Sequence, residues 1–335
     1  MKNLSKPIYI AEIGSNHSGY LNSALNHITQ AASIGFNAVK FQFIQNHKIW
    51  HNDCDDIFKL SKKEEFPSEW FKPIRSHCKS LGINVGYSPT FEGASKIIKE
   101  ELSDFIKVAS PQSEFDKFIL DEAIDTGLKL IISNGYSDFS STKETLEYVA
   151  SKKVNSAMLF CVSEYPADNV IFPYEEAIEL QKLCKDFGID FGFSDHYKSM
   201  MPALSLANIG ASVFEKHFIL DNVESLDKSV SLNINESAEY IKQLNYIYDE
   251  PKITRNKTFH NKRDLYVSSF YLKRDVLKGE KLYLTDFTRK RNCKGDLCNT
   301  YDLWKLFQDK SLNKYYLKNM KKGDRLNNGD FKIDF

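Results

Sequence analysis

The chain has 335 residues, and its 45 Lys and Arg balance its 45 Asp and Glu, so the formal net charge is zero. That balance points to no nucleic-acid or membrane partner, and no stretch reaches the ~18 apolar residues of a membrane span. The six cysteines form no CxxC pair, and the first residues turn polar too early for a signal peptide. We therefore expect a soluble, cytoplasmic protein with reduced thiols.

Helical segments that end in glycine recur along the chain, and each is followed within a few residues by an apolar, strand-like run. Examples are AASIG-FNAVKFQF, HCKSLG-INVGYS and LCKDFG-IDFGFS. Glycine at a helix C-terminus can adopt the left-handed conformation that turns the chain into the next element. Helical and strand signals that alternate in this way indicate βαβ units and a parallel sheet.

Eight segments have the composition of buried strands. They cover residues 8–13, 37–43, 84–88, 104–110, 129–133, 157–161, 190–194 and 212–218. Eight such units in about 240 residues match the size of a (β/α)8 TIM barrel, an α/β fold. An open doubly wound sheet is the alternative, but no GxGxxG follows the first strand, and this favours the barrel.

The helix–strand pattern fades after about residue 248, where the composition changes. A polar segment at 251–263 predicts a linker, and short β-like runs with glycine turns follow it. We expect a catalytic barrel over 1–250 and a small, mostly β domain over 264–335. From Lys262 onward 18 Lys and Arg face 10 Asp and Glu, whereas the rest of the chain has 27 against 35. A basic tail on an acidic body suggests an anionic ligand between two units, or a solvated basic surface.

Polar side chains stand at or near the carboxyl ends of most predicted strands, the edge that forms the active-site face of such a barrel. These candidates are Glu12, Asn16, Lys40, Gln42, Ser88, Lys107, Ser110, Ser163, Tyr165, Ser194, Asp195, His196, Glu215 and His217. Lysine is costly inside a barrel unless it is paired or faces an anion. Lys40 and Lys107 therefore predict either a phosphate or carboxylate site, together with the serine hydroxyls, or ion pairs within the barrel. The acidic partners for such pairs are Glu12 and Glu215.

Two histidines, His196 and His217, end the last two predicted strands. Neighbouring strands lie roughly 5 Å apart, so the two side chains can converge on one point. A single histidine at a strand end is more often a hydrogen-bonded structural residue, but two at adjacent ends favour a metal site. Two neutral imidazoles suit a divalent metal, with carboxylate, water or substrate oxygen in the remaining positions.

Six ordered motifs resemble those of the sialic acid synthase family, which includes synthases for N-acetylneuraminate, legionaminate and pseudaminate. They are IAEIGSNHSG, AVKFQ, DFIKVAS, CVSEYP, FSDH and EKHF, and they run along nearly the whole barrel. The tail resembles the family's antifreeze-like (SAF) domain, with KGE at 278–280 and a basic run at 289–291.

The resemblance implies a condensation in which phosphoenolpyruvate adds through its C3 to the aldehyde of an open-chain N-acylated hexosamine. Water attacks C2 and phosphate leaves, which yields a nine-carbon 2-keto-3-deoxy acid. The resemblance further implies that His196 and His217 hold Mn²⁺ or another divalent metal, which acts as a Lewis acid on the aldehyde oxygen.

The resemblance also assigns roles to single positions. Glu12, Lys107 and Asp195 are counted as catalytic, with Glu12 in a general acid–base role. Lys40, Lys107, Ser110, Ser163 and Ser194 match binders of phosphoenolpyruvate, Gln42, Tyr165 and Asp227 match sugar contacts, and Asn16 and Ser88 are added as substrate-binding residues. Arg291 matches an arginine that the tail of a partner subunit inserts into the site, which implies a domain-swapped homodimer.

The sequence departs from the family's usual motifs at Ser88-Pro89-Thr90, Val162, Lys228 and Asn292. These changes leave the histidine pair and both lysines intact, and they bear on the acceptor sugar rather than on the reaction. Three other functions stay open: condensation of phosphoenolpyruvate with a shorter or 6-phosphorylated sugar, a metal-dependent barrel hydrolase or isomerase, and a non-catalytic binding protein. A hydrolase site usually has more protein ligands than two histidines.

Overall fold

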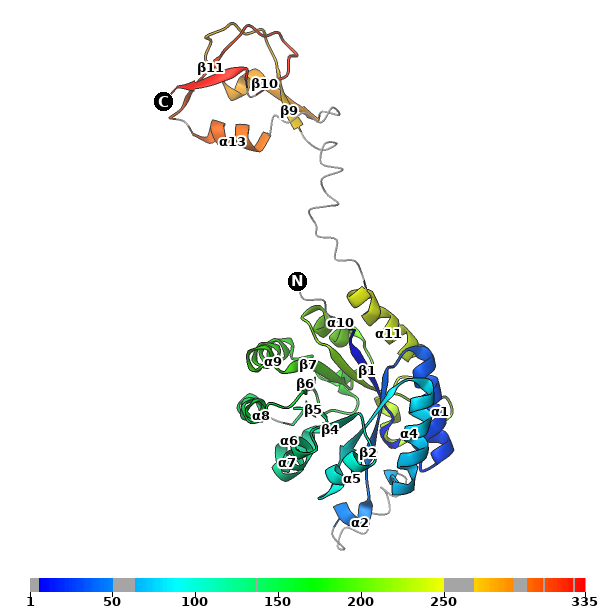
Figure 1. The fold of residues 1–335 in the computed structure, drawn as a ribbon. Coiled ribbons are helices and arrows are strands. Elements are labelled where there is room, and N and C mark those ends of the chain that lie inside the picture. Colours follow the sequence, from blue (N-terminus) through cyan, green and yellow to red (C-terminus); the bar gives the residue numbers. More distant parts are fainter. Residues whose placement is uncertain are drawn as a thin grey trace. The chain divides into compact units, whose positions relative to one another are not determined.

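The computed structural model describes residues 6–50, 64–136, 138–249, 268–291, 300–309, 311–327 and 329–334. The chain divides into two compact units, Met1–Glu250 and Pro251–Phe335 (Figure 1). The predicted linker at 251–263 lies outside the described residues. Within the described part, no helix is long and apolar enough to cross a membrane.

The predicted TIM barrel is confirmed, because eight parallel strands close into one sheet in chain order and β8 pairs with β1. The strands are β1 Ile8–Glu12, β2 Ala38–Phe43, β3 Asn84–Pro89, β4 Phe105–Val108, β5 Lys129–Ser133, β6 Ser156–Cys161, β7 Asp190–Asp195 and β8 Val213–His217. The strand expected at 104–110 stops at Val108, because Ser110 already begins a helix with Pro111 in its first turn.

Helices surround the barrel and cover its outer face (Figure 1). They are α1 Leu21–Ile34, α4 Phe71–Leu81, α5 Ala94–Glu100, α6 Ser110–Phe115, α7 Lys117–Asp125, α8 Phe139–Ser151, α9 Tyr174–Phe187, α10 Met201–Asn208 and α11 Ile234–Asp249, with the short α2 Asn46–Ile49, η1 Gly14–His17, η3 Ser68–Trp70, η4 Ala167–Asn169 and η5 Leu226–Ser229. The predicted glycine stops are present at Gly35, Gly82 and Gly188, whose φ angles of 108°, 70° and 70° are left-handed.

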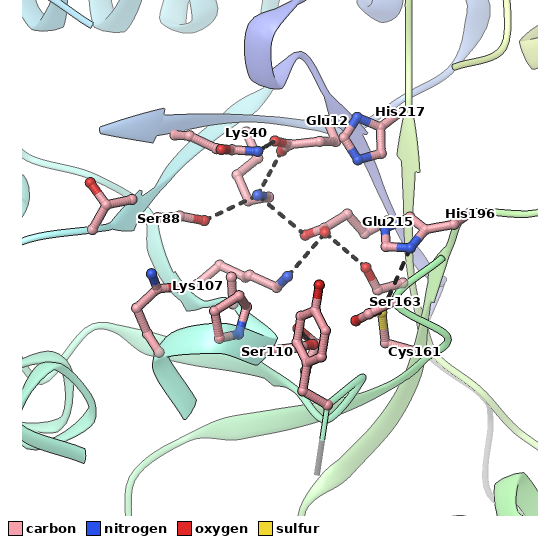
Figure 2. Close-up of a pocket in the computed structure, with 18 of the residues that line it drawn as sticks. Glu12, Lys40, Ser88, Lys107, Ser110, Cys161, Ser163, His196, Glu215 and His217 are labelled. Atoms are coloured by element: carbon pink, nitrogen blue, oxygen red, sulfur yellow. Dashed lines mark hydrogen bonds and ion pairs between the residues drawn. The ribbon is translucent and has the colours of Figure 1, made fainter. Parts of the chain in front are cut away.

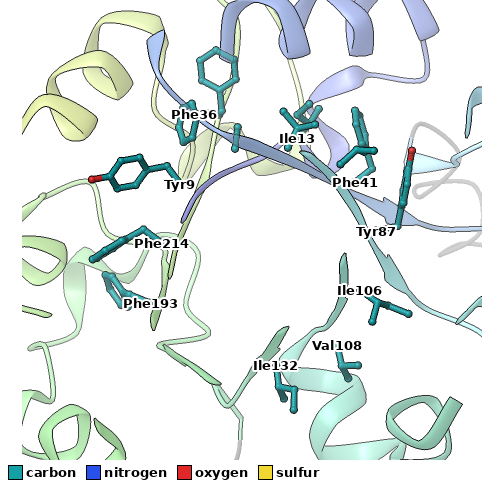
Figure 3. Close-up of a cluster of buried hydrophobic side chains, with 14 of the residues drawn as sticks. Tyr9, Ile13, Phe36, Phe41, Tyr87, Ile106, Val108, Ile132, Phe193 and Phe214 are labelled. Carbon is teal, nitrogen blue, oxygen red and sulfur yellow. The ribbon is translucent and has the colours of Figure 1, made fainter. Parts of the chain in front are cut away.

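Two apolar layers hold the barrel together. The outer layer lies between strands and helices and contains side chains such as Phe41, Phe193 and Phe214 (Figure 3). The inner layer fills the lower part of the barrel with Ile10, Ala38, Phe105, Ile131, Ala157, Leu159 and Val213. Successive residues of a strand point to opposite faces, so the polar residues that point inward near the strand ends stand above this apolar floor.

The C-terminal unit is small and mostly β, as expected. It contains two antiparallel pairs, β9 Ser268–Leu272 with β10 Phe287–Arg291 and β11 Asn313–Tyr316 with β12 Phe331–Asp334. The helix α13, Thr300–Gln308, and the single turn η6, Leu284–Asp286, complete its described elements. It has a core of its own, built from Phe270, Leu272, Val276, Leu282, Phe287, Tyr316, Met320 and Leu326.

Gly86 on β3 leaves room for the ring of Phe105 in the inner layer. A Cβ at residue 86 would lie 2.2 Å from that ring. We expect Gly86→Ala to destabilise the barrel by about 1–3 kcal/mol, the usual cost of overpacking, measured by urea unfolding. A second change, Phe105→Leu, should recover part of that loss in a double-mutant cycle. Equal stability of Gly86→Ala and the wild type would contradict this packing.

Candidate active site

A polar pocket of about 190 Å³ opens at the carboxyl ends of the barrel strands (Figure 2). The predicted site residues that line it are Glu12, Lys40, Gln42, Ser88, Lys107, Ser110, Ser163, Tyr165, Ser194, His196 and His217. Glu215, which stood among the strand-end candidates as a possible ion-pair partner, also lines the pocket. The pocket further contains residues that were not predicted, namely Thr90, Ala109, Pro111, Gln112, Ser133, Tyr136 and Cys161. Ser133 and Cys161 each end a strand, so strand-end position was a usable signal for them.

Four buried charges alternate in sign across the pocket. Lys40 Nζ lies 2.7 Å from Glu12 Oε2 and 3.9 Å from Glu215 Oε2. Lys107 Nζ lies 3.2 Å from Glu215 Oε1. Figure 2 shows Lys40 between the two carboxylates, and all four side chains are 5% exposed or less. The predicted ion pairs with Glu12 and Glu215 are therefore present, and they compensate the cost of burying both lysines.

The carboxyl groups of Glu12 and Glu215 have well-separated pKa values, although both lie beside Lys40. Burial raises the pKa of Glu12 to about 7, and the attraction of Lys40 offsets only part of that effect. Burial also opposes ionisation of Glu215, but Lys107 and Lys40 together outweigh it and lower its pKa to about 2. Glu12 can therefore exchange a proton near neutral pH, whereas Glu215 stays negative and anchors both lysines.

Hydroxyl groups gather on the side of the pocket near Lys107. Ser110 Oγ donates to Ser133 Oγ at 3.0 Å and accepts from the backbone N–H of Gly135 at 2.7 Å. Gly135 makes this close approach possible, because a Cβ there would lie 2.0 Å from Ser163 Oγ. An ammonium group beside several hydroxyls can bind a phosphate or a carboxylate.

His196 and His217 lie next to each other, with ring centroids 5.5 Å apart. His196 Nδ1 is 2.8 Å from the carbonyl oxygen of Val162. A carbonyl only accepts, so Nδ1 carries a proton, and Nε2 has a free lone pair whenever the ring is neutral. Burial opposes the charged form of His196, but the neighbouring Cys161 outweighs this effect and raises its pKa. Burial, followed by the repulsion of His196, holds the pKa of His217 well below its usual value. The ring of Tyr165 packs against His196 at 4.3 Å.

This pair fits a divalent metal in chemistry and in environment. One imidazole has its tautomer set by a carbonyl, and His217 Nδ1 has no hydrogen-bond partner among the described residues. In the described part of the chain, no group of three or more His, Cys, Asp and Glu side chains is arranged to hold a metal. Substrate or water oxygens would therefore have to supply the other ligands.

Two predicted residues, Asn16 and Asp227, are not among those that line the pocket. Asn16 Nδ2 donates to the carbonyl of Phe218 at 2.9 Å and to Ser231 Oγ at 2.8 Å. Asp227 Oδ2 accepts from the backbone N–H of Ser15 at 2.8 Å. The same oxygen is 3.7 Å from His217 Nδ1, so Asp227 lies next to the histidine pair.

The other two predicted residues outside this pocket are Asp195 and Arg291. Asp195 Oδ1 lies 3.5 Å from Lys216 Nζ, and both side chains are buried. Asp195 follows Ser194, which lines the pocket, so alternation turns its carboxylate toward the outer face of the strand. Arg291 ends β10 in the C-terminal unit, where it lines a separate pocket with Lys290 and Lys322.

The positions that depart from the resembled motifs have local roles. Ser88 Oγ accepts from Lys40 Nζ at 3.0 Å, and Thr90 Oγ1 donates to the carbonyl of Phe43 at 2.6 Å. Val162 contributes the carbonyl that sets the tautomer of His196. Asn292 lies outside the described residues.

The fold and the pocket define a TIM-barrel enzyme whose strand ends bring two buried lysines beside a histidine pair. The chain belongs to the NeuB family, whose model matches residues 27–250. It is 27% identical over 305 residues to the pseudaminic acid synthase of Helicobacter pylori, covering 83% of this chain and 86% of that protein. It is also 27% identical over 323 residues to the N,N'-diacetyllegionaminic acid synthase of Campylobacter jejuni, with coverage of 89% and 94%.

The fold is also found in a solved structure. A crystal structure of the N-acetylneuraminic acid synthetase from Leptospira borgpetersenii matches with a TM-score of 0.68 and 26% sequence identity. The match covers 78% of this chain and 93% of that chain. The likeness therefore extends over most of both chains and supports the family assignment made from the sequence.

The raised pKa of Glu12 predicts a pH-dependent stability. The unfolded carboxyl titrates near 4.5 and the folded one near 7, so the proton stabilises the folded state. Stability from this group is complete below about pH 4.5 and is lost as the pH rises through about 7. Glu12→Gln, which mimics the protonated form, should remove this loss in urea unfolding followed from about pH 5 to about pH 8.

An exposed glutamate provides the control for that measurement. Glu176→Gln on helix α9 changes the same functional group at the surface, and it should keep the pH dependence of the wild type. Parallel stability curves for Glu12→Gln and the wild type would show that Glu12 is ionised throughout this range.

Proposed function

We propose that this protein is a nonulosonic acid synthase that condenses phosphoenolpyruvate with the aldehyde of an open-chain N-acylated hexosamine. Membership of the NeuB family and the named relatives support the class of enzyme. The observation that carries the finer assignment is the pocket itself, where two buried lysines and several serine hydroxyls adjoin two buried histidines. One pocket can thus hold an anionic substrate next to the aldehyde carbonyl of a second substrate.

Phosphoenolpyruvate has a phosphate and a carboxylate, and the pocket offers donors for both. Lys107 and the hydroxyls of Ser110 and Ser163 form one cluster, and Lys40 with Ser88 forms a second. Charge-assisted hydrogen bonds from buried lysines are stronger than neutral ones. The ion pairs with Glu12 and Glu215 hold both lysine side chains in place before the ligand binds.

His196 and His217 would hold a divalent metal such as Mn²⁺. When bound, the metal supplies Lewis acidity toward the aldehyde oxygen. Tyr165, whose ring packs against His196, would border the acceptor sugar. Gln42 donates to Glu12 Oε1 at 3.1 Å and places a second amide hydrogen at the same side of the pocket.

The condensation moves protons, and Glu12 is the residue suited to that task. The new C–C bond joins C3 of phosphoenolpyruvate to the aldehyde carbon, and the former aldehyde oxygen takes up a proton. Water adds at C2 and gives up a proton, and the C2–O bond to phosphate then breaks. A carboxyl group with a pKa of about 7 can accept and return a proton at neutral pH.

The reaction is tested by phosphate release from phosphoenolpyruvate in the presence of Mn²⁺ and a panel of hexosamines that includes N-acetylmannosamine. We expect release to require both substrates, to stop in excess EDTA and to return with added Mn²⁺, because two histidines alone hold the metal within the protein. Mass spectrometry of the products identifies the acceptor.

Release of phosphate from phosphoenolpyruvate in the absence of any sugar would indicate a hydrolase rather than a synthase. Full activity in excess EDTA would remove the metal from the mechanism and leave the histidines as hydrogen-bonding groups. A product formed only from a phosphorylated or shorter sugar would keep the reaction and change the acceptor.

The active form is proposed to be a domain-swapped homodimer in which Arg291 of the C-terminal unit completes the site of a partner. The resemblance of the basic tail to an antifreeze-like domain supports this arrangement, as does the excess of positive charge beyond Lys262. The C-terminal unit has a separate hydrophobic core, which a unit exchanged between subunits requires.

Mixing two inactive variants tests the swapped arrangement. Arg291→Ala and His217→Ala each impair every site of their own dimers, but a mixed dimer contains one site with neither change. Random subunit exchange should therefore restore about a quarter of wild-type activity. No recovery, after mass spectrometry has confirmed exchange, would mean that each tail serves its own barrel. Lys290→Ala, which removes the neighbouring charge, should remain active.

A further inference from the structure

Lys216 is a buried lysine that faces away from the pocket. It lies on β8 between Glu215 and His217, both of which line the pocket. Because successive residues of a strand alternate, its side chain extends toward the outer face of the barrel. It is 1% exposed there, and burying a charge at this depth requires specific partners.

The partners of Lys216 lie on both sides of His196. Its Nζ donates to the carbonyl oxygen of Asp195 at 3.1 Å and to the carbonyl oxygen of Tyr197. Asp195 Oδ1 lies 3.5 Å from the same nitrogen and accepts from the backbone N–H of Tyr197 at 2.9 Å. One ammonium group thus binds the residue before His196 and the residue after it.

We infer that Lys216 is a positioning residue that keeps His196 and His217 in a fixed relation. It is bonded covalently to His217, and its side chain holds the backbone on either side of His196. The resemblance counted Asp195 as catalytic, but in this arrangement its carboxylate is the counter-ion of the Lys216 ammonium group. The inference rests on the proposed function, in which the two histidines act together on a metal.

Stability alone is a poor reason for such a pair. Burying two charges is expensive, and replacing a buried ion pair by apolar side chains of similar volume is often neutral or stabilising. The geometry offers a better reason, since residues that orient metal ligands from behind influence metal affinity strongly. Two further contacts hold the backbone of this loop: the N–H of Ala167 donates to the carbonyl oxygen of His196 at 3.2 Å, and the carboxylate of Asp168 accepts from the N–H of Lys198 at 3.0 Å.

The test replaces the pair by neutral side chains of similar size, in the full-length variant Asp195→Asn/Lys216→Met. Two measurements are made: amide hydrogen exchange of residues 195–199, and Mn²⁺ binding by electron paramagnetic resonance. We expect faster exchange in this segment and a Mn²⁺ affinity that is lower by about 10- to 100-fold, the range for residues behind metal ligands. Urea unfolding should show little change in stability.

Lys198→Met is the matched control. Lys198 lies in the same loop, and its Nζ donates to the carbonyl of Ser231 at 2.6 Å, which does not adjoin His196. This variant should keep wild-type Mn²⁺ affinity. Leu146→Ala, on the buried face of helix α8, reports what a general loss of stability does to Mn²⁺ binding.

Each result decides between the possibilities. Unchanged exchange and unchanged Mn²⁺ affinity in the double variant overturn the inference. If the wild type itself binds no Mn²⁺, the metal in the proposed function fails, and the exchange measurement still tests the tie between Lys216 and the loop. If the double variant does not fold, Lys216→Gln, which keeps one donor, takes its place. Failure of both to fold would make Lys216 a general stability residue and overturn the inference.

Discussion

The shared position of Lys40 between Glu12 and Glu215 is the interaction on which the rest of the site depends. Burial of an ion costs several kcal/mol unless an opposite charge compensates it. Each of the four charged side chains in this pocket therefore depends on its oppositely charged neighbour. Their spacing is set by the register of the sheet, which places Glu12 directly beside Lys40 on one neighbour and beside His217 on the other. The ion pairs also set the protonation of the two carboxyl groups, because the pKa of Glu12 stays at about 7 whereas that of Glu215 falls to about 2.

The barrel separates chemical from supporting residues by the alternation of single strands. On β7 and β8 the inward positions Ser194 and Glu215 line the pocket, and the outward positions Asp195 and Lys216 form a buried pair behind it. The apolar inner layer below the pocket gives these polar groups a rigid floor. A strand can therefore bring a reactive group to the substrate and fix its orientation with the very next residue.

The close packing around the pocket explains why small residues occur beside its functional groups. Gly135 allows Ser110, Ser163 and its own N–H to approach one another, and any side chain there would collide with Ser163. Gly14 has a φ of 47°, and a Cβ there would lie 2.4 Å from Asp227 Oδ2. Both glycines let hydroxyl and carboxylate groups lie close to the lysines and histidines of the pocket, so these polar groups are oriented by packing alone.

The sequence by itself determined the eight strands and the barrel, and with them the edge at which polar side chains gather, because these follow from local periodicity and from glycine at helix ends. It also indicated Lys40, Lys107 and the histidine pair, since parallel strands of a barrel end on one face. Only the tertiary structure decided that Asp195 and Asn16 support the site from behind, that Lys216 binds around His196, and that Gln112 on helix α6 and Tyr136 in a turn reach the pocket. The physical reason is that the direction of a side chain, the register of a strand and the position of a loop all depend on contacts between distant segments. The same contacts shift the pKa of a buried carboxyl group such as Glu12.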